Sequence, residues 1–281
     1  MKASRRGFLK AFGQVMLGSV VAGAIGYSYS TQIEPDWLTV ERVQIPLKKL
    51  KPALEGFKLV QMSDIHLHPY TQLEFVQKAV ARANELKPDL VVLTGDYVLE
   101  GADSIFELAP VLAGLNAKYG IFTILGNHDL WTNAEVVCTG LRQAGLPVLV
   151  NDGLALGVGS ELLYLAGLDD GWSGQLDLKA ALAKLSSDVP AILLLHEPDL
   201  ADYFAQDGRI SLQLSGHSHG GQVRLPGIGA PILPRLGRKY DQGLYRVQDL
   251  WLYTTRGIGL GPVPARFNCP PEITEITLVS A

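Results

Sequence analysis

The chain has 281 residues, of which 47% are hydrophobic and 19% charged, a composition that permits a sizeable core and excludes a largely disordered protein. Its length fits one large domain or two small ones. The formal net charge is −4, but four basic side chains lie in the first ten residues, and the remainder holds 20 basic and 28 acidic residues. An acidic body makes a nucleic-acid partner an unfavourable expectation, because such binding requires Lys and Arg to neutralise phosphates.

Residues 1–31 have the pattern of an export signal. A basic head precedes an uncharged stretch from Ala11 to Thr31, and the heptapeptide SRRGFLK (4–10) resembles the twin-arginine signal. That resemblance implies recognition by the twin-arginine export machinery and transport across the cytoplasmic membrane. The uncharged stretch is near the lower limit for spanning a bilayer, so a cleaved signal peptide and an N-terminal anchor both stay open. In either case we expect the body in the periplasm, the cell wall or on the outer face of the membrane.

The rest of the chain predicts an α/β fold. Residues 32–56 contain three prolines and predict a linker with an edge strand near residues 37–45. Helical patterns cover residues 71–87 and 103–118. Short apolar runs end in polar clusters at residues 57–66, 89–96, 120–129, 191–199 and 210–219. Further strand-like runs, at 162–168, 250–257 and 272–279, suggest a second sheet with antiparallel members in a domain spanning 57–281.

The polar clusters hold a set of candidate metal ligands. Ligands of open α/β sheets bind at the carboxyl ends of the strands, so these clusters are expected to meet in one crevice. Imidazoles and carboxylates without thiolates suit Mn, Zn, Fe or Co. In extended backbone, residues i and i+2 point to the same side, so Asp64 with His66, and His217 with His219, form two pairs for two metal ions. The clusters contain all six histidines and four further polar residues: His66, His68, His128, His196, His217, His219, Asp64, Asp96, Asn127 and Asp129.

Five sequence blocks resemble, in order, those of the calcineurin-like metallophosphoesterases. They are Asp64-Ile65-His66, Gly95-Asp96, Gly126-Asn127-His128-Asp129, His196 and Gly216-His217-Ser218-His219. The resemblance covers residues 57–279, and segments 216–235 and 256–278 are similar to the exported bacterial phosphodiesterase branch. It implies a layered α-β-β-α sandwich of two mixed sheets, with the metal site at the strand carboxyl ends.

The resemblance also implies a role for each site residue. Asp64, His66 and His219 would hold the first metal, and Asn127, His196 and His217 the second, with Asp96 bridging the two ions. His128 would act beside the metals without ligating them, and Asp129 would orient His128 by a hydrogen bond.

These roles imply a dinuclear metal-dependent phosphoesterase in which a metal-bridging hydroxide attacks phosphorus. We expect a phosphodiesterase acting on a cell-envelope or lipid-linked phosphodiester. Three alternatives stay open: a phosphomonoesterase, a pyrophosphatase acting on a nucleotide-linked lipid precursor, and a non-catalytic binding module, which the complete ligand set disfavours.

Several residues have two interpretations. His68 is a substrate contact or a solvated loop residue, and Arg266 approaches the phosphate or braces the C-terminal strand. The two cysteines, Cys138 and Cys269, are expected to be unpaired core residues, although export would permit pairing. The basic side chains of Arg224, Arg235, Arg238 and Lys239 contact a second anionic group of the substrate, contact lipid headgroups, or belong to a solvated loop.

Overall fold

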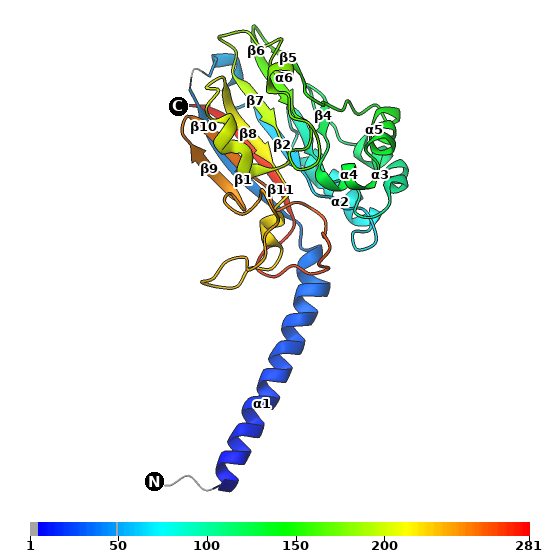
Figure 1. Ribbon diagram of the computed structural model, residues 1–281, viewed down its shortest axis with the longest axis vertical. Coiled ribbons are helices and arrows are strands. Elements are labelled where there is room, and N and C mark those ends of the chain that lie inside the picture. The colour runs from blue at the N-terminus through cyan, green and yellow to red at the C-terminus, as the bar shows by residue number, and fades with distance from the viewer. Residues whose placement is uncertain (1–4, 49) are drawn as a thin grey trace.

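The computed structural model describes residues 5–48 and 50–281, and Figure 1 shows its elements. The α-helices are α1 (Arg5–Ser28), α2 (Leu73–Glu85), α3 (Ile105–Leu112), α4 (Asn127–Thr132), α5 (Ala134–Gln143), α6 (Leu178–Ala181) and α7 (Ala201–Phe204). The strands are β1 (Thr39–Leu47), β2 (Lys58–Met62), β3 (Leu90–Thr94), β4 (Ile121–Ile124), β5 (Asp152–Val158), β6 (Glu161–Gly167), β7 (Ala191–Leu194), β8 (Ile210–Ser215), β9 (Gly243–Val247), β10 (Leu250–Thr254) and β11 (Glu272–Ser280).

The strands form two mixed sheets. The first has the order β1-β11-β2-β3-β4, in which only the β11–β2 pair is antiparallel. The second has the order β5-β6-β7-β8-β10-β9, with parallel inner strands and antiparallel edge strands β5 and β9. In each sheet, three or more neighbouring strands therefore present their carboxyl ends at the same edge.

Three hydrophobic layers join the sheets and helices. Alternate residues of β3 enter two of them: Val91 and Leu93 pack with the side chains of α2, α3 and α5, whereas Leu90 and Val92 pack against the second sheet. The outer face of the second sheet buries its side chains against α6 and α7, including Phe204. The result is the α-β-β-α sandwich of two mixed sheets that the family resemblance implies.

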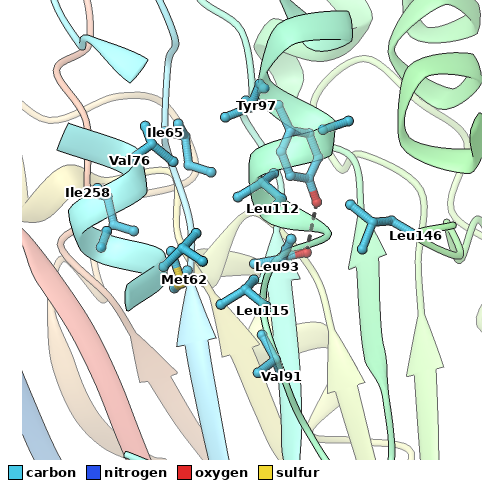
Figure 2. Close-up of a cluster of buried hydrophobic side chains, with 14 of the residues drawn as sticks. Met62, Ile65, Val76, Val91, Leu93, Tyr97, Leu112, Leu115, Leu146 and Ile258 are labelled. Carbon is cyan, nitrogen blue, oxygen red and sulfur yellow. Dashed lines mark hydrogen bonds between the residues drawn. The ribbon is translucent and has the colours of Figure 1, made fainter. Parts of the chain in front are cut away.

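Figure 2 shows the layer between the first sheet and its helices, where Met62, Val91 and Leu93 meet Leu112. Tyr97 is buried in this layer, and its hydroxyl donates to the carbonyl of Leu93 (3.2 Å). Because Tyr97 directly follows Asp96, this anchor fixes the loop after β3 to the core.

One strand lies where the sequence does not place it. The run at residues 272–279 is expected in the second sheet, but β11 lies in the first sheet between β1 and β2. Its apolar residues supply both core layers of that sheet, since Ile273 packs toward the helices and Ile276 toward the second sheet. A strand with two buried faces carries no sequence signal that names its partner strand.

Helix α1 projects away from the sandwich, and the short segment that follows it packs on the body (Figure 1). The backbone N–H of Arg266 donates to the carbonyl of Ser30 (2.8 Å), and the buried carboxylate of Glu34 accepts from the N–H groups of Asn268 (2.9 Å) and Cys269. The start of the expected linker is thus tied to the body. None of the described helices is both long and apolar enough to span a membrane. Ser4, the first residue of the twin-arginine pattern, lies outside the described residues.

Candidate metal centre

Five loops meet at one edge of the sandwich, each at the carboxyl end of a strand. Three follow β2, β3 and β4 of the first sheet, and two follow β7 and β8 of the second. The two sheets therefore contribute to a single site, which lies between them at their common carboxyl edge. The candidate ligands that these loops bury are Asp64, His66, Asp96, Asn127, His196, His217 and His219.

The backbone at five of these residues is left-handed, so the two i, i+2 pairs do not lie in the extended backbone that the sequence predicts. Asp64, His66 and Asp96 have φ of 53°, 48° and 56°, and His217 and His219 have φ of 71° and 52°. Non-glycine residues rarely adopt such angles, at a cost of about 1–3 kcal/mol each, and they concentrate at functional sites. The turns still bring Asp64 and His66 together, whereas His217 and His219 turn toward different groups.

The first group consists of Asp64, His66 and His219, whose ligand atoms lie within 4.8 Å of one another. The two histidine Nε2 atoms are 3.0 Å apart, and His219 Nε2 is 3.2 Å from Asp64 Oδ1. The backbone N–H of His217 also donates to Asp64 Oδ1 (2.9 Å), which fixes the carboxylate. These are the three residues assigned to the first metal from the sequence.

The second group consists of Asp96, His196 and His217, again within 4.8 Å. His196 Nδ1 donates to the carbonyl of Thr94 (2.6 Å), which leaves its buried Nε2, 3.1 Å from Asp96 Oδ2, as an electron-pair donor. His217 Nε2 donates to the carbonyl of Arg235 (2.6 Å), which leaves Nδ1 of this ring as the atom that can bind a metal. Such backbone bonds select the tautomer in which the other ring nitrogen can bind a metal.

Asp96, a member of the second group, lies between the histidines of both groups. Its Oδ2 is 3.4 Å from His66 Nε2 in one direction and 3.1 Å from His196 Nε2 in the other. Its Oδ1 accepts from the backbone N–H of His128 (2.8 Å). A Cβ on Gly126 would lie 2.3 Å from the same Oδ1, so only glycine permits this approach. The position between both groups suits a carboxylate that bridges two ions.

The charges of the site favour a bound cation. Burial opposes ionisation of Asp64 and Asp96, but His219 and His196 outweigh it and hold the pKa of both carboxyls below the usual range. Burial lowers the pKa of His66 to about 3 and that of His217 to about 4, so both rings are neutral at pH 7. Burial opposes protonation of His196, but Asp96 and Asp64 outweigh it and raise the pKa of this ring well above its usual range. A bound cation would displace that proton and supply the positive charge that the two buried carboxylates require.

The residues fit a pair of divalent ions. Within the site, Asn127 Oδ1 and His196 Nε2 are buried and have no hydrogen-bond partner among the described residues, as is expected of atoms that bind a metal. Asn127 opens α4, directly after Gly126, and its side chain is buried. The donor set contains imidazole, carboxylate and amide groups and no thiolate, which suits borderline or hard divalent ions.

Asp129 has other partners than the sequence predicts. Its two oxygens accept from the backbone N–H groups of Asp96 (2.9 Å), Tyr97 (2.9 Å), Val98 (3.4 Å) and Gly126 (3.0 Å). All four bonds go to backbone, so the expected hydrogen bond to the His128 ring is corrected. Asp129 instead joins the loop after β3 to the loop after β4.

His128 is half-buried beside the first group. Its ring centroid is 4.7 Å from that of His66, and its Nδ1 is 3.4 Å from the carbonyl of Leu99. The ring therefore borders the site while its Nε2 stays available.

Sequence reasoning missed the residues that wall one side of the site. Trp131 lies two residues after Asp129 and packs against His128, with ring centroids 4.8 Å apart and the ring planes tilted by 56°. Trp172 follows β6 and approaches His217 at 5.7 Å. Its turn is held by the buried carboxylates of Asp170 and Glu197, which accept from Trp172 N (3.1 Å) and Gly171 N (2.7 Å). The available signal is the segment LDDGW, in which one glycine separates an acidic pair from a tryptophan at a strand end.

The residues with two interpretations now have defined surroundings. Arg266 is fully buried and donates to the carbonyls of Cys269, Arg256, Gly257 and Gly259 at 2.6–3.0 Å, so it braces these loops. His68 pairs at the surface with Glu107, outside both ligand groups.

The basic loop and the cysteines are also placed. Arg224 and Lys239 form ion pairs of 2.6 Å with Asp241 and Asp202, and no described ion pair involves Arg235 or Arg238. Cys138 and Cys269 are both free thiols.

Comparison with known proteins agrees with this geometry. The family model for calcineurin-like phosphoesterases matches residues 57–221. The chain is 39% identical to the uncharacterized metallophosphoesterase YkuE of Bacillus subtilis, over 99% of both chains. It is 33% identical to the phosphodiesterase YaeI of Escherichia coli (98% of this chain, 99% of the relative). It is 28% identical to the UDP-2,3-diacylglucosamine pyrophosphatase LpxG of Chlamydia muridarum (90% and 93%). The chain belongs to the calcineurin-like phosphoesterase family and is a metallophosphoesterase.

Proposed function

We propose that this metallophosphoesterase is a phosphodiesterase that holds two divalent ions and hydrolyses a cell-envelope or lipid-linked phosphodiester. The observation that carries the proposal is the position of Asp96 between two groups of buried ligands, 3.4 Å from His66 Nε2 and 3.1 Å from His196 Nε2. Two ions bound there would polarise the phosphate and lower the pKa of bound water. Mn, Zn, Fe and Co all suit the donor set.

Each residue has a proposed part. Asp64, His66 and His219 hold one ion, Asn127, His196 and His217 hold the other, and Asp96 belongs to both. His128 transfers a proton through Nε2 to the leaving oxygen of the ester, because its Nδ1 is directed to the Leu99 carbonyl. Asp129 accepts from the backbone N–H groups of Asp96 and Gly126 and so holds together the loops that carry Asp96 and His128.

The diester preference rests on the relatives. YaeI is named a phosphodiesterase, and LpxG is named for a diphosphate that carries a lipid. A pyrophosphatase is therefore the second candidate, because its substrate also presents a disubstituted phosphorus, with a phosphate in place of the alcohol as the leaving group.

Hydrolysis by chelator-stripped protein tests the proposal. We expect bis-p-nitrophenyl phosphate to be cleaved faster than p-nitrophenyl phosphate when Mn²⁺, Zn²⁺, Co²⁺ or Fe²⁺ is added back singly. A faster monoester reaction would indicate a phosphomonoesterase. A lack of turnover with every ion and both esters would contradict the proposal and favour a binding module.

Export is proposed from the SRRGFLK head, with the body in the periplasm, the cell wall or on the outer face of the cytoplasmic membrane. The matched test replaces Arg5 and Arg6 by Lys in the full chain and follows the protein by cell fractionation. Retention of the variant in the cytoplasm is expected. Equal export of both chains would exclude the twin-arginine route.

A further inference from the structure

Two tryptophans, Trp131 and Trp172, line the metal centre between His128 and His217. The ring centroids of Trp131 and Trp172 are 5.0 Å apart, and the pair reaches from His128 (4.8 Å) to His217 (5.7 Å). One wall of the site is therefore an unbroken series of aromatic rings. Trp131 keeps half of its surface exposed, and Trp172 is partly exposed. Neither indole belongs to the hydrophobic core, so core packing does not explain them.

The wall is rigidly supported. The indole N–H of Trp131 donates to the hydroxyl of Ser173 (2.8 Å), which ties the α4 end of the wall to the turn that carries Trp172. The buried Asp170 carboxylate accepts from the N–H groups of Trp172 (3.1 Å) and Ser173 (2.5 Å). A surface held in place without a ligand loses little conformational entropy when a ligand binds.

Arg235 adds a positive charge to this wall. Its guanidinium carbon lies 5.8 Å from the Trp172 ring centroid, and its carbonyl accepts from His217 Nε2 (2.6 Å). No described carboxylate pairs with it, whereas Arg224 in the same segment forms an ion pair with Asp241. The carboxylates nearest in sequence to Trp172, those of Asp169 and Asp170, accept from backbone N–H groups of their own turn.

Indole faces favour a ring, and a guanidinium favours an anion. An acyl chain would use the indoles and leave the arginine without a partner, and a cationic group such as choline would be repelled by the arginine. We propose that Trp131, Trp172 and Arg235 bind the organic group next to the scissile phosphate, and that this group is a ring with a second negative charge close to that phosphate. The inference rests on the proposed phosphoesterase site and names the class of substrate that the site takes.

Binding of three small-molecule probes to the full-length, Mn²⁺-loaded protein tests this inference by titration calorimetry. The probes are α,β-methylene-ADP, which has a ring and two anionic groups, methylenediphosphonate, which has no ring, and AMP, which has one anionic group. Trp172→Ala should weaken α,β-methylene-ADP about tenfold and leave methylenediphosphonate within about twofold. Arg235→Met should weaken α,β-methylene-ADP about tenfold and AMP less than about threefold.

The matched controls are Trp37→Ala, an exposed tryptophan outside the wall, and Arg238→Met, three residues from Arg235. Both should leave all three affinities unchanged. Trp172→Phe should retain most of the binding. If Trp172→Ala loses metal, Trp131→Ala tests the same contact with the ring of α,β-methylene-ADP. Equal weakening of every probe, or none, would overturn the inference. Hydrolysis of bis-p-nitrophenyl phosphate in the same samples reports separately on the proposed function.

Discussion

Asp129 Oδ2 accepts a hydrogen bond of 2.9 Å from the backbone N–H of Asp96, the residue that lies between the two groups of candidate ligands. The same oxygen accepts from Gly126, directly before Asn127. One carboxylate therefore sets the distance between two loops that carry ligands from neighbouring strands. The sequence suggests that Asp129 acts through the His128 ring, and the structure indicates that it acts through the Asp96 backbone.

Asp129→Asn should weaken metal binding by about 10- to 100-fold, because the amide nitrogen would face backbone N–H groups that need an acceptor. Metal titration of chelator-stripped protein measures this change. The double variant with His128→Ala gives the control. If Asp129 acts independently of His128, the two losses of activity multiply. A double variant no slower than His128→Ala alone would indicate that Asp129 acts by orienting the His128 ring.

His128→Ala should keep its metal and lose about 10²- to 10⁴-fold in kcat, because the ring borders the ligand groups and supplies only proton transfer. Elemental analysis and steady-state kinetics on the same sample measure both quantities. Loss of an ion from this variant would show that His128 is a ligand. The geometry permits that outcome, because a ring nitrogen of His128 lies within 4.8 Å of the ligand atoms of His66 and Asp96.

Arg266→Met should lower the free energy of unfolding by about 3 kcal/mol, because the carbonyls that it binds lose their donor in a buried region. Urea unfolding measures the change, and the exposed Arg238→Met, expected within about 0.5 kcal/mol of the unmodified chain, is the matched control. A variant of unchanged stability with greatly reduced activity would instead indicate direct contact between Arg266 and the phosphate.

Removal of metal should lower the melting temperature, because Asp64 and Asp96 would remain buried without a cation. Thermal unfolding with and without chelator measures the difference. The control is Asp96→Asn, in which chelator should have little effect because the bridging ligand is already lost. An equal shift in both proteins would place the stabilising ion elsewhere.

The α/β fold and the clustering of ligands are predicted because both follow from local patterns, and the resemblance to the family implies the layered sandwich. Apolar runs mark the strands, and the polar residues that end them must gather at the carboxyl edge. The partner of β11 could not be predicted, because both its faces are buried. The position of Trp172 depends also on Glu197, which accepts from Gly171 N across 26 residues of sequence, and no local pattern reveals this contact.

The number of metal ions bound per chain tests the central claim most directly. Elemental analysis of stripped protein reconstituted with Mn²⁺ should find two ions per chain in the unmodified protein. In Asp96→Asn it should find fewer, with almost no diester hydrolysis. One ion per unmodified chain, or two ions retained by an active Asp96→Asn, would contradict a dinuclear centre shared through Asp96.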